Sequence, residues 1–304
     1  MELKHLRYYL AVADQLSFAR AADNLHIAQT GLSQRIMALE REFGLSLFDR
    51  SRSHVRLTPS GEALRADIER IVHDADRLVA RAASLAASER GIVRLAHTKS
   101  ASSGLPTRLV AEFRRRHPEM TLEVAAGSTA DNLPRLRRRE LDVAFVRPPF
   151  DTEPALGCLT LAYEPLVLIV PERHRLARGR RIARTDLLDE PLVTFPRENG
   201  PQFYDRMMDQ VYGADHRPPI ATIEPDIEYT IAAAAEGVGV AIVGAAMAAT
   251  LRPAGIVVRQ FAAPQPMMPI AVAWNRNAVS AGLDTFLEFV RWRSGDAAAI
   301  ASAG

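Results

Sequence analysis

Uncharged polar side chains gather in one short stretch near the N-terminus. They are Gln29, Thr30, Ser33 and Gln34, and the apolar Met37 accompanies them. At helical spacing these residues share a face at the start of a helix, and amide and hydroxyl groups there can bond to base edges in the major groove, glutamine most selectively to adenine. Arg35 lies beside them and is expected to contact a phosphate. The pattern therefore predicts a helix that reads duplex DNA.

Three helices are expected to position this face. Apolar residues at helical spacing predict a first helix that ends near residues 14–16. Ser17 is a suitable N-cap for a second helix over residues 18–25, and a third is predicted over residues 29–43 with Gly44 ending it. Its buried stripe should be Leu32, Ile36, Leu39 and Phe43. The alternative is a bundle of three helices packed for stability only.

A basic turn follows these helices. Residues 47–48 and 55–57 alternate as two short strands, and the turn over residues 49–54 between them is rich in arginine. We expect a wing that contacts the DNA backbone through Arg50, Arg52, His54 and Arg56. Residues 1–58 should thus form a winged helix-turn-helix domain.

A long helix is predicted over residues 59–90, with Thr58 as N-cap and Pro59 at its first position. Its apolar residues advance by alternating steps of four and three, which is typical of a coiled-coil seam that pairs two copies of a chain. The seam consists of Leu64, Ile68, Ile71, Ala75, Leu78, Ala82 and Leu85. Deletion of residues 59–90 is therefore expected to abolish dimerisation. The alternative is a helix that lies on its own C-terminal domain.

From residue 91 onward, short apolar strands alternate with helical segments, which favours an α/β domain with a largely parallel sheet. Strands are expected at 92–97, 121–126, 142–146, 165–170, 191–194, 220–223, 238–242, 256–258 and 269–274, and helices at 105–117, 130–139, 201–212, 226–236 and 279–293.

The carboxyl ends of such strands are where α/β domains bind ligands, because helix N-termini point there. Polar or aromatic residues follow several predicted strands. They are Thr98, Lys99, Ser100, Ser128, Thr129, Arg147, Pro201 and Phe203. Arg147 can hold a carboxylate through two hydrogen bonds. Helix capping by the hydroxyl residues, a structural ion pair for Arg147 and core packing for Phe203 remain alternatives.

Composition limits the remaining classes. The 304 residues are 48% hydrophobic and 24% charged, which is typical of a globular protein of two or three domains. The single cysteine, Cys158, excludes an internal disulfide, and we expect no metal site. The N-terminus resembles no signal peptide, so a cytoplasmic protein is expected. Arginine clusters at 114–116, 135–139 and 173–184 are interpreted as solvated surface.

The stretch SFARAADNLHIAQTGLSQRIMALEREFGLSLFDRSRSHVRLTPSGEAL resembles the N-terminal signature of LysR-type transcriptional regulators. The resemblance continues through GIVRLAHTKSASSGLPTRLVAEFRRRHPEMTLEVAAGSTADNLPRLRRRELDVAF and AAAAEGVGVAIVGAAMA. Two residues depart from the usual pattern, since Thr30 and Gly31 stand where the family has Pro and Ala. Gly31 costs roughly 1 kcal/mol of helix propensity, and its missing side chain lets the backbone approach DNA closely.

The resemblance implies two α/β sub-domains similar to type 2 periplasmic binding proteins, over residues 91–161 with 268–304 and over residues 162–267, with an effector between them. In the branch that controls degradation of aromatic compounds, effector contacts match Ser100, Thr129, Arg147 and Phe203. A small aromatic or dicarboxylic acid is therefore expected as effector, together with a homodimer or homotetramer, operator DNA, RNA polymerase as a partner and no cofactor.

Two other classes of protein could contain the same C-terminal fold. An enzyme could use the same fold, but the sequence has no phosphate-binding GxxxxGK, no nucleophile elbow and no paired metal ligands. A ligand sensor or solute-binding protein without DNA binding would share the C-terminal domain and would not need residues 1–58. The expected function is therefore a DNA-binding regulator switched by a small molecule.

Overall fold

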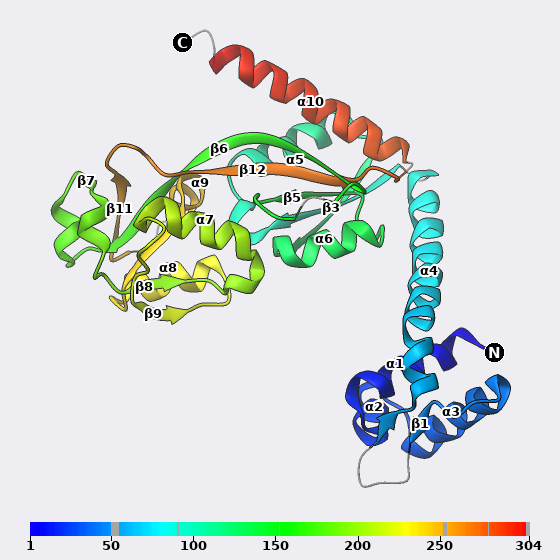
Figure 1. Cartoon of the computed structure of the whole chain (residues 1–304). Helices are drawn as coiled ribbons and strands as arrows, with labels where there is room; N and C mark the ends of the chain where they lie inside the picture. Colours follow the sequence, from blue (N-terminus) through cyan, green and yellow to red (C-terminus); the bar gives the residue numbers. More distant parts are fainter. Residues whose placement is uncertain (50–54, 90, 152, 252–253, 279, 302–304) are drawn as a thin grey trace. The chain divides into compact units, whose positions relative to one another are not determined.

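The structure is a computed structural model that describes residues 1–49, 55–89, 91–151, 153–251, 254–278 and 280–301. The chain divides into two compact units, Met1–Arg81 and Ala82–Gly304, and the boundary falls inside one long helix (Figure 1). Each unit has its own hydrophobic core, so each is described by itself.

The first unit is a helical bundle with a small hairpin. Its helices are α1 (Leu3–Gln15), α2 (Phe18–Asn24) and α3 (Gln29–Phe43), and its antiparallel strands are β1 (Phe48–Asp49) and β2 (Arg56–Leu57). Ser17 caps α2 by accepting a hydrogen bond from the Arg20 backbone N–H at 3.3 Å, and Gly44 ends α3 in the left-handed region at φ 68°. The predicted winged helix-turn-helix is confirmed.

The long helix α4 (Pro59–Glu89) begins as an integral part of this first unit. Thr58 caps it by accepting from Gly61 N at 3.0 Å, and the Tyr9 hydroxyl donates to Gly61 O at 2.6 Å. A side chain at position 61 would lie 2.3 Å from Leu47 O, so only glycine allows this approach. Burial raises the pKa of Tyr9 to about 12.

Two residues of the predicted coiled-coil seam, Leu64 and Ile68, pack inside the first unit. Ile68 is 3% exposed and belongs to the core with Tyr9 and Leu32, and Leu64 packs against the same cluster. For Ile68 the prediction of an intermolecular contact is therefore wrong, because three-helix packing covers the side chain. Ile71 and Leu78 are 45% and 68% exposed and stay available to a partner. Leu85 lies outside the described side chains.

The second unit contains one mixed sheet with the strand order β4-β3-β5-β12-β6-β10-β8-β9, while β11 pairs with β6 and β7. Sub-domain I holds β3 (Ile92–Thr98), β4 (Thr121–Gly127) and β5 (Val143–Val146), with α5 (Leu105–Arg116), α6 (Thr129–Arg137) and α10 (Ala281–Ala301). Sub-domain II holds β7 (Arg181–Ile182), β8 (Leu192–Thr194), β9 (Ile220–Ile223), β10 (Val240–Gly244) and β11 (Ile256–Phe261), with α7 (Pro201–Tyr212), α8 (Ile227–Ala235) and α9 (Ala245–Thr250).

Two long strands join the sub-domains. Figure 1 shows β6 (Leu156–Pro171) and β12 (Met267–Asn275) running side by side through both. They pair antiparallel with each other and with β5, β10 and β11, so the expectation of a largely parallel sheet holds only within each sub-domain. The prediction of a strand over residues 165–170 was too short, because residues 158–163 of β6 are only partly buried or exposed and lack a continuous apolar run.

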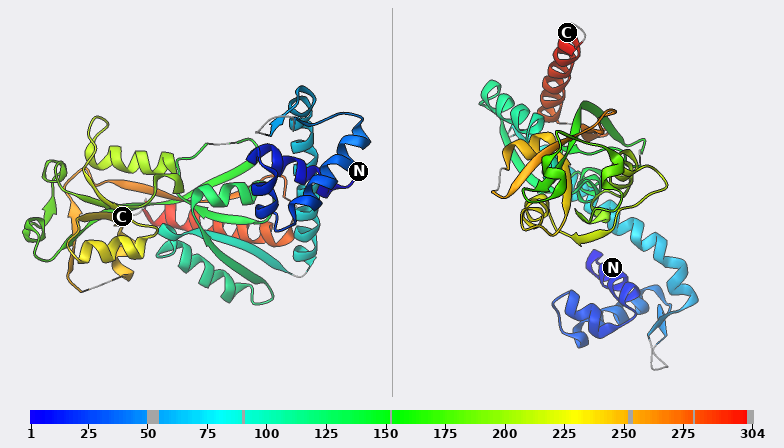
Figure 2. Two further views of the ribbon diagram at one scale, coloured as in Figure 1. Left: turned by 90° about the horizontal axis from the view of Figure 1, so that it is seen from below. Right: turned by 90° about the vertical axis from the view of Figure 1, so that its left-hand side faces the viewer.

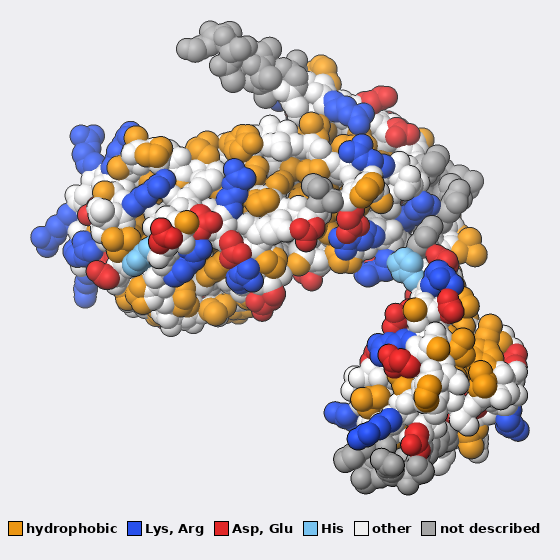
Figure 3. Space-filling model, viewed as in Figure 1, with side chains coloured by type: hydrophobic (Ala, Val, Ile, Leu, Met, Phe, Trp, Pro, Cys, Tyr) orange, Lys and Arg blue, Asp and Glu red, His pale blue; other side chains and the backbone are white. Residues whose placement is uncertain are grey.

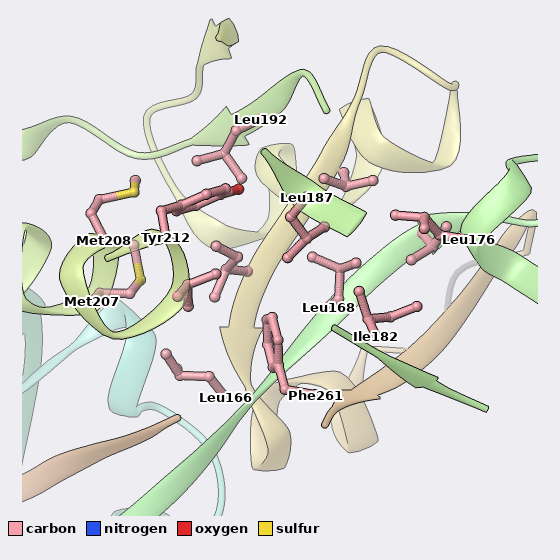
Figure 4. Packing of buried hydrophobic residues seen from close by; sticks show 14 of the residues in the cluster. Leu166, Leu168, Leu176, Ile182, Leu187, Leu192, Met207, Met208, Tyr212 and Phe261 are labelled. Atoms are coloured by element: carbon pink, nitrogen blue, oxygen red, sulfur yellow. The ribbon is translucent and has the colours of Figure 1, made fainter. Parts of the chain in front are cut away.

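Helices cover both faces of each half of the sheet, which explains the uninterrupted apolar strands. In the left panel of Figure 2, α7 (yellow-green) and α8 (yellow) lie on opposite sides of the strands of sub-domain II. Leu168 and Ile242 pack on the α7 side and Ile169 and Val243 on the α8 side. Figure 4 shows the α7-side cluster, in which Tyr212 and Phe261 supply the aromatic bulk.

Candidate functional site

A cavity of about 200 Å³ lies between the two sub-domains of the second unit. Seven of the eight residues predicted to bind an effector line it, namely Thr98, Lys99, Ser100, Ser128, Thr129, Arg147 and Phe203. Pro201 does not: it is exposed at the first position of α7, where its ring starts the helix without reaching the cavity, so its assignment to the lining was wrong.

The helix α6 directs its N-terminus at the cavity. Ser128 accepts from the Asp131 backbone N–H at 3.0 Å, and Asp131 accepts in return from Ser128 N at 3.0 Å, which forms a capping box. The hydrogen bonds from Ser128 lower the pKa of Asp131. Ser128 therefore caps α6, which was the alternative to ligand binding, and it also lines the cavity.

Arg147, directly after β5, is the most deeply buried charged side chain in the cavity wall. Its Nη2 donates to Glu164 Oε2 at 2.5 Å and to Ser100 O at 2.6 Å, and its side chain is 4% exposed. Glu164 also accepts from Ala246 N at 2.9 Å. The structural ion pair considered for Arg147 is thus present. Its Nε and Nη1 have no hydrogen-bond partner among the described protein groups.

A second ion pair joins the sub-domains at the cavity. Lys99 Nζ lies 3.2 Å from Asp226 Oδ2, and Asp226 caps α8 by accepting from Glu228 N at 3.1 Å and Tyr229 N at 3.2 Å. Burial opposes ionisation of Asp226, but the hydrogen bonds from Tyr229 and Lys99 outweigh it and lower its pKa. The Lys99 side chain is 55% exposed, so this pair is strongly screened by water.

The remaining wall is apolar and comes mainly from sub-domain II. Phe203 is 7% exposed and takes part both in the cavity lining and in the core cluster under α7, so binding and packing roles coexist. Phe195 lies 6.3 Å from it between ring centroids, and the Arg147 guanidinium lies 5.9 Å from the Phe203 ring centroid. Met207, Ile242 and Val243 complete this side.

Sequence reasoning missed the acidic members of this site. Glu164 was not singled out, because it lies directly before the predicted strand over residues 165–170, in the part of β6 that was not predicted as a strand. Asp226 stood only as the first residue of a predicted helix, where an acidic N-cap was a usable signal. Neither ion pair could be predicted from local spacing. Glu164 lies 17 residues from Arg147, and Asp226 lies 127 residues from Lys99.

The first unit presents the predicted polar face of α3 to solvent. Leu32, Ile36 and Leu39 are fully buried. Gln29, Thr30, Gln34 and Arg35 are exposed, Met37 is 41% exposed, and Ser33 is half-buried. The Arg35 guanidinium lies 5.6 Å from the Tyr8 ring centroid, which holds it beside this face.

The wing is described only at its base. Arg56 is exposed in β2, while Arg50, Arg52 and His54 lie outside the described residues. Glu40, on α3, accepts from Leu47 N at 2.8 Å and from Phe48 N at 3.1 Å, and so ties the base of the hairpin to the helix.

Other kinds of site find little support in the part of the chain that the structure covers. Within those residues, no three His, Cys, Asp or Glu side chains are grouped so that they could hold a metal ion. No helix there combines the length and hydrophobicity needed to cross a membrane. Burial raises the pKa of the Cys158 thiol.

Comparisons with known families match both units. Residues 3–62 match the model described as "Bacterial regulatory helix-turn-helix protein, lysR family", and residues 86–294 match the "LysR substrate binding domain". Among curated proteins, the HTH-type transcriptional regulator BudR of Raoultella terrigena is 32% identical over 289 residues, which cover 95% of this chain and 99% of that protein.

Solved structures agree along the whole chain. The LysR family transcriptional regulator CbnR matches with a TM-score of 0.64 and 26% identity, covering 97% of this chain and 99% of that one. Full-length CbnR in complex with its target DNA matches with a TM-score of 0.60 at the same 26% identity, over 97% of this chain and all of that one. With these matches, an exposed polar face on α3 and a cavity between two α/β sub-domains, the chain belongs to the LysR family of DNA-binding transcriptional regulators.

Proposed function

We propose that the effector of this regulator is a small carboxylic acid with an apolar body, either aromatic or dicarboxylic, bound in the cavity between the sub-domains. The observation that carries the proposal is Arg147. Its buried Nε and Nη1 lack a partner among the described groups, and guanidinium N–H groups form strong, charge-assisted hydrogen bonds to carboxylate oxygens.

The opposite wall supports an apolar body for the ligand. Phe195, Phe203 and Met207 form a surface on which an aromatic ring or a short hydrocarbon chain can lie, and small-molecule sites typically combine such a surface with a few polar groups. Lys99 supplies a second cation at the cavity, which suits the second carboxylate of a dicarboxylic acid.

The test compares ligands that differ only in charge. Purified full-length protein is titrated with small aromatic acids and aliphatic dicarboxylic acids, and in parallel with the amides of the same acids, by thermal shift and calorimetry. At least one acid should stabilise the protein while its amide does not, since a ligand that binds only the folded state raises the melting temperature. Equal stabilisation by acid and amide, or none by any acid, would refute the proposal.

The proposed switch is conformational. The effector would bind two arrangements of the sub-domains with different affinity, because only a difference in affinity can shift an equilibrium between them. The Lys99–Asp226 pair joins the two sub-domains directly, so its strength contributes to the balance between these arrangements.

The remaining parts of the proposal concern DNA and partners. Gln29, Thr30, Ser33, Gln34, Arg35 and Met37 would meet bases and nearby phosphates, and Arg50, Arg52, His54 and Arg56 would meet the backbone. The protein would act in the cytoplasm, on the nucleoid, as a homodimer or homotetramer that alters access of RNA polymerase, without catalysis or cofactor.

A further inference from the structure

Sub-domain II contains a group of arginines that do not line the effector cavity. Residues 173–184 contain six arginines and no acidic residue. Arg175 and Arg178 lie in a short 3-10 helix (Arg175–Arg178), Arg181 in β7 and Arg184 at the start of a second 3-10 helix (Arg184–Leu187), while Arg173 and Arg180 lie in the connecting turns. All six side chains are exposed. Figure 3 shows Lys and Arg side chains gathered at the left-hand end of this unit, over β7 and its neighbours.

The residues between the arginines hold this segment firmly in place. Leu176, Ile182 and Leu187 are at most 5% exposed and belong to the core cluster under α7. β7 pairs in parallel with β11, and Arg259 of β11 donates to the Ala177 carbonyl. The arginines are therefore presented by a packed segment, so little backbone ordering is needed when they bind a ligand.

Two of the nearby acids are engaged with other groups. Glu190 pairs with His174 at 2.9 Å and with Arg175 at 2.5 Å, and Asp186 accepts from the Ala183 backbone N–H at 2.9 Å. The other five arginines form no ion pair with any acid among the described residues. These five, Arg173, Arg178, Arg180, Arg181 and Arg184, are called the arginine patch below.

The two other arginine clusters differ in this respect. In the cluster at 114–116, Arg116 pairs with Glu112 at 3.1 Å and its guanidinium lies 4.2 Å from the Trp292 ring centroid. In the cluster at 135–139, Arg137 pairs with Glu153 at 2.5 Å and Arg138 with Glu140 at 2.6 Å. Those two clusters are partly neutralised by local ion pairs, whereas the arginine patch is not.

We propose that the arginine patch binds phosphates of duplex DNA, in addition to the DNA that the α3 face reads. Unpaired guanidinium groups are weakly hydrated and match phosphate oxygens through two parallel hydrogen bonds, and each phosphate they neutralise releases counterions. Duplex DNA is the favoured polyanion because the chain is a DNA-binding regulator and holds duplex close to itself. An acidic protein surface is the competing partner and is distinguished by the test.

The test measures the salt dependence of DNA binding by the full-length protein. Fluorescence anisotropy with a labelled duplex of random sequence gives the affinity between about 50 and 200 mM KCl, where each phosphate contact contributes about 0.9 to the slope of log affinity against log salt. The variant R178Q/R180Q/R181Q keeps Arg175 on Glu190 and should make that slope shallower by about 2 to 3, with weaker binding at low salt.

The matched control is R108Q/R115Q/R206Q, which removes the same charge from exposed arginines scattered over α5 and α7. Both variants are first checked for an unchanged melting temperature. The control should leave the slope close to that of the unsubstituted protein. Equal slope changes in both variants would assign the effect to net charge and overturn the proposal. An unchanged slope in the patch variant, with loss of transcription in a purified polymerase assay, would overturn it in favour of an acidic protein partner.

Discussion

At the scale of single residues, the cavity depends on a charge that is balanced inside the protein. The Arg147 and Glu164 side chains are 4% and 8% exposed, and Glu164 also accepts from Ala246 N. Removal of one member of a buried ion pair leaves the other charge without compensation, which costs far more than the pair contributes to stability. Arg147 therefore has a structural role in addition to its proposed contact with an effector.

This role predicts the stability of two variants. R147A should lower the free energy of unfolding by about 3–5 kcal/mol, because it leaves Glu164 buried and unpaired. The double variant R147M/E164Q should recover most of that loss, since it removes both charges and keeps an amide oxygen for Ala246 N. Urea unfolding of the full-length protein measures both. If the double variant is as unstable as R147A, uncompensated charge is not the cause.

At the scale of elements, α3 combines a fully buried stripe with an exposed polar face. Leu32, Ile36 and Leu39 anchor the helix, while Gln34 and its neighbours face solvent. Gly31 lies between them in an ordinary helical conformation, and a Cβ there would meet nothing within 4 Å. The protein alone therefore gives no steric reason for glycine at this position.

The open space at Gly31 leads to a prediction with two readouts. Gly31→Ala should raise the free energy of unfolding by about 0.5–1 kcal/mol, because alanine favours the helix. If the α3 backbone lies against DNA at this point, the same methyl group should weaken binding to a genomic fragment selected by the unsubstituted protein by at least about tenfold, or about 1.4 kcal/mol. A more stable variant with unchanged affinity would show that DNA does not approach the backbone there.

At the scale of the whole molecule, the exposed part of α4 is the predicted interface for assembly. Ile71 and Leu78 are seven residues apart and 45% and 68% exposed, which is the spacing of a coiled-coil seam. Deletion of the whole helix is a poor test of dimerisation, because Ile68 and Gly61 belong to the folded first unit. Substitution of the exposed residues alone avoids that difficulty.

We expect I71N/L78N to shift the full-length protein toward monomer in sedimentation velocity, since polar groups at both seam positions remove the apolar contact. L16N/L45N is the matched control, because Leu16 and Leu45 are 48% and 46% exposed elsewhere on the first unit. The control should keep the oligomeric state of the unsubstituted protein. A dimer that survives in I71N/L78N would place the main interface outside α4.

The sequence by itself determined the features that depend on local spacing. The period of Leu32, Ile36 and Leu39, the caps Ser17 and Thr58, and Gly44 placed the helices of the first unit to within a residue or two of their bounds. The alternation of strands and helices placed most of the α/β unit, and the position of polar residues after strands identified seven of the 21 residues that line the cavity. These signals are local, because backbone hydrogen bonding and burial both follow the periods of helix and strand.

Tertiary structure alone decided which distant residues meet. The register of β6 against β12 and the packing of β5 bring Glu164 to Arg147, and docking of α8 brings Asp226 to Lys99 across 127 residues. Tertiary packing also decided what covers Ile68. Its position in the heptad pattern is compatible both with a contact to a partner chain and with burial in the core of its own unit. Spacing shows which face of an element is apolar, but the choice of what covers that face depends on the packing of the whole unit.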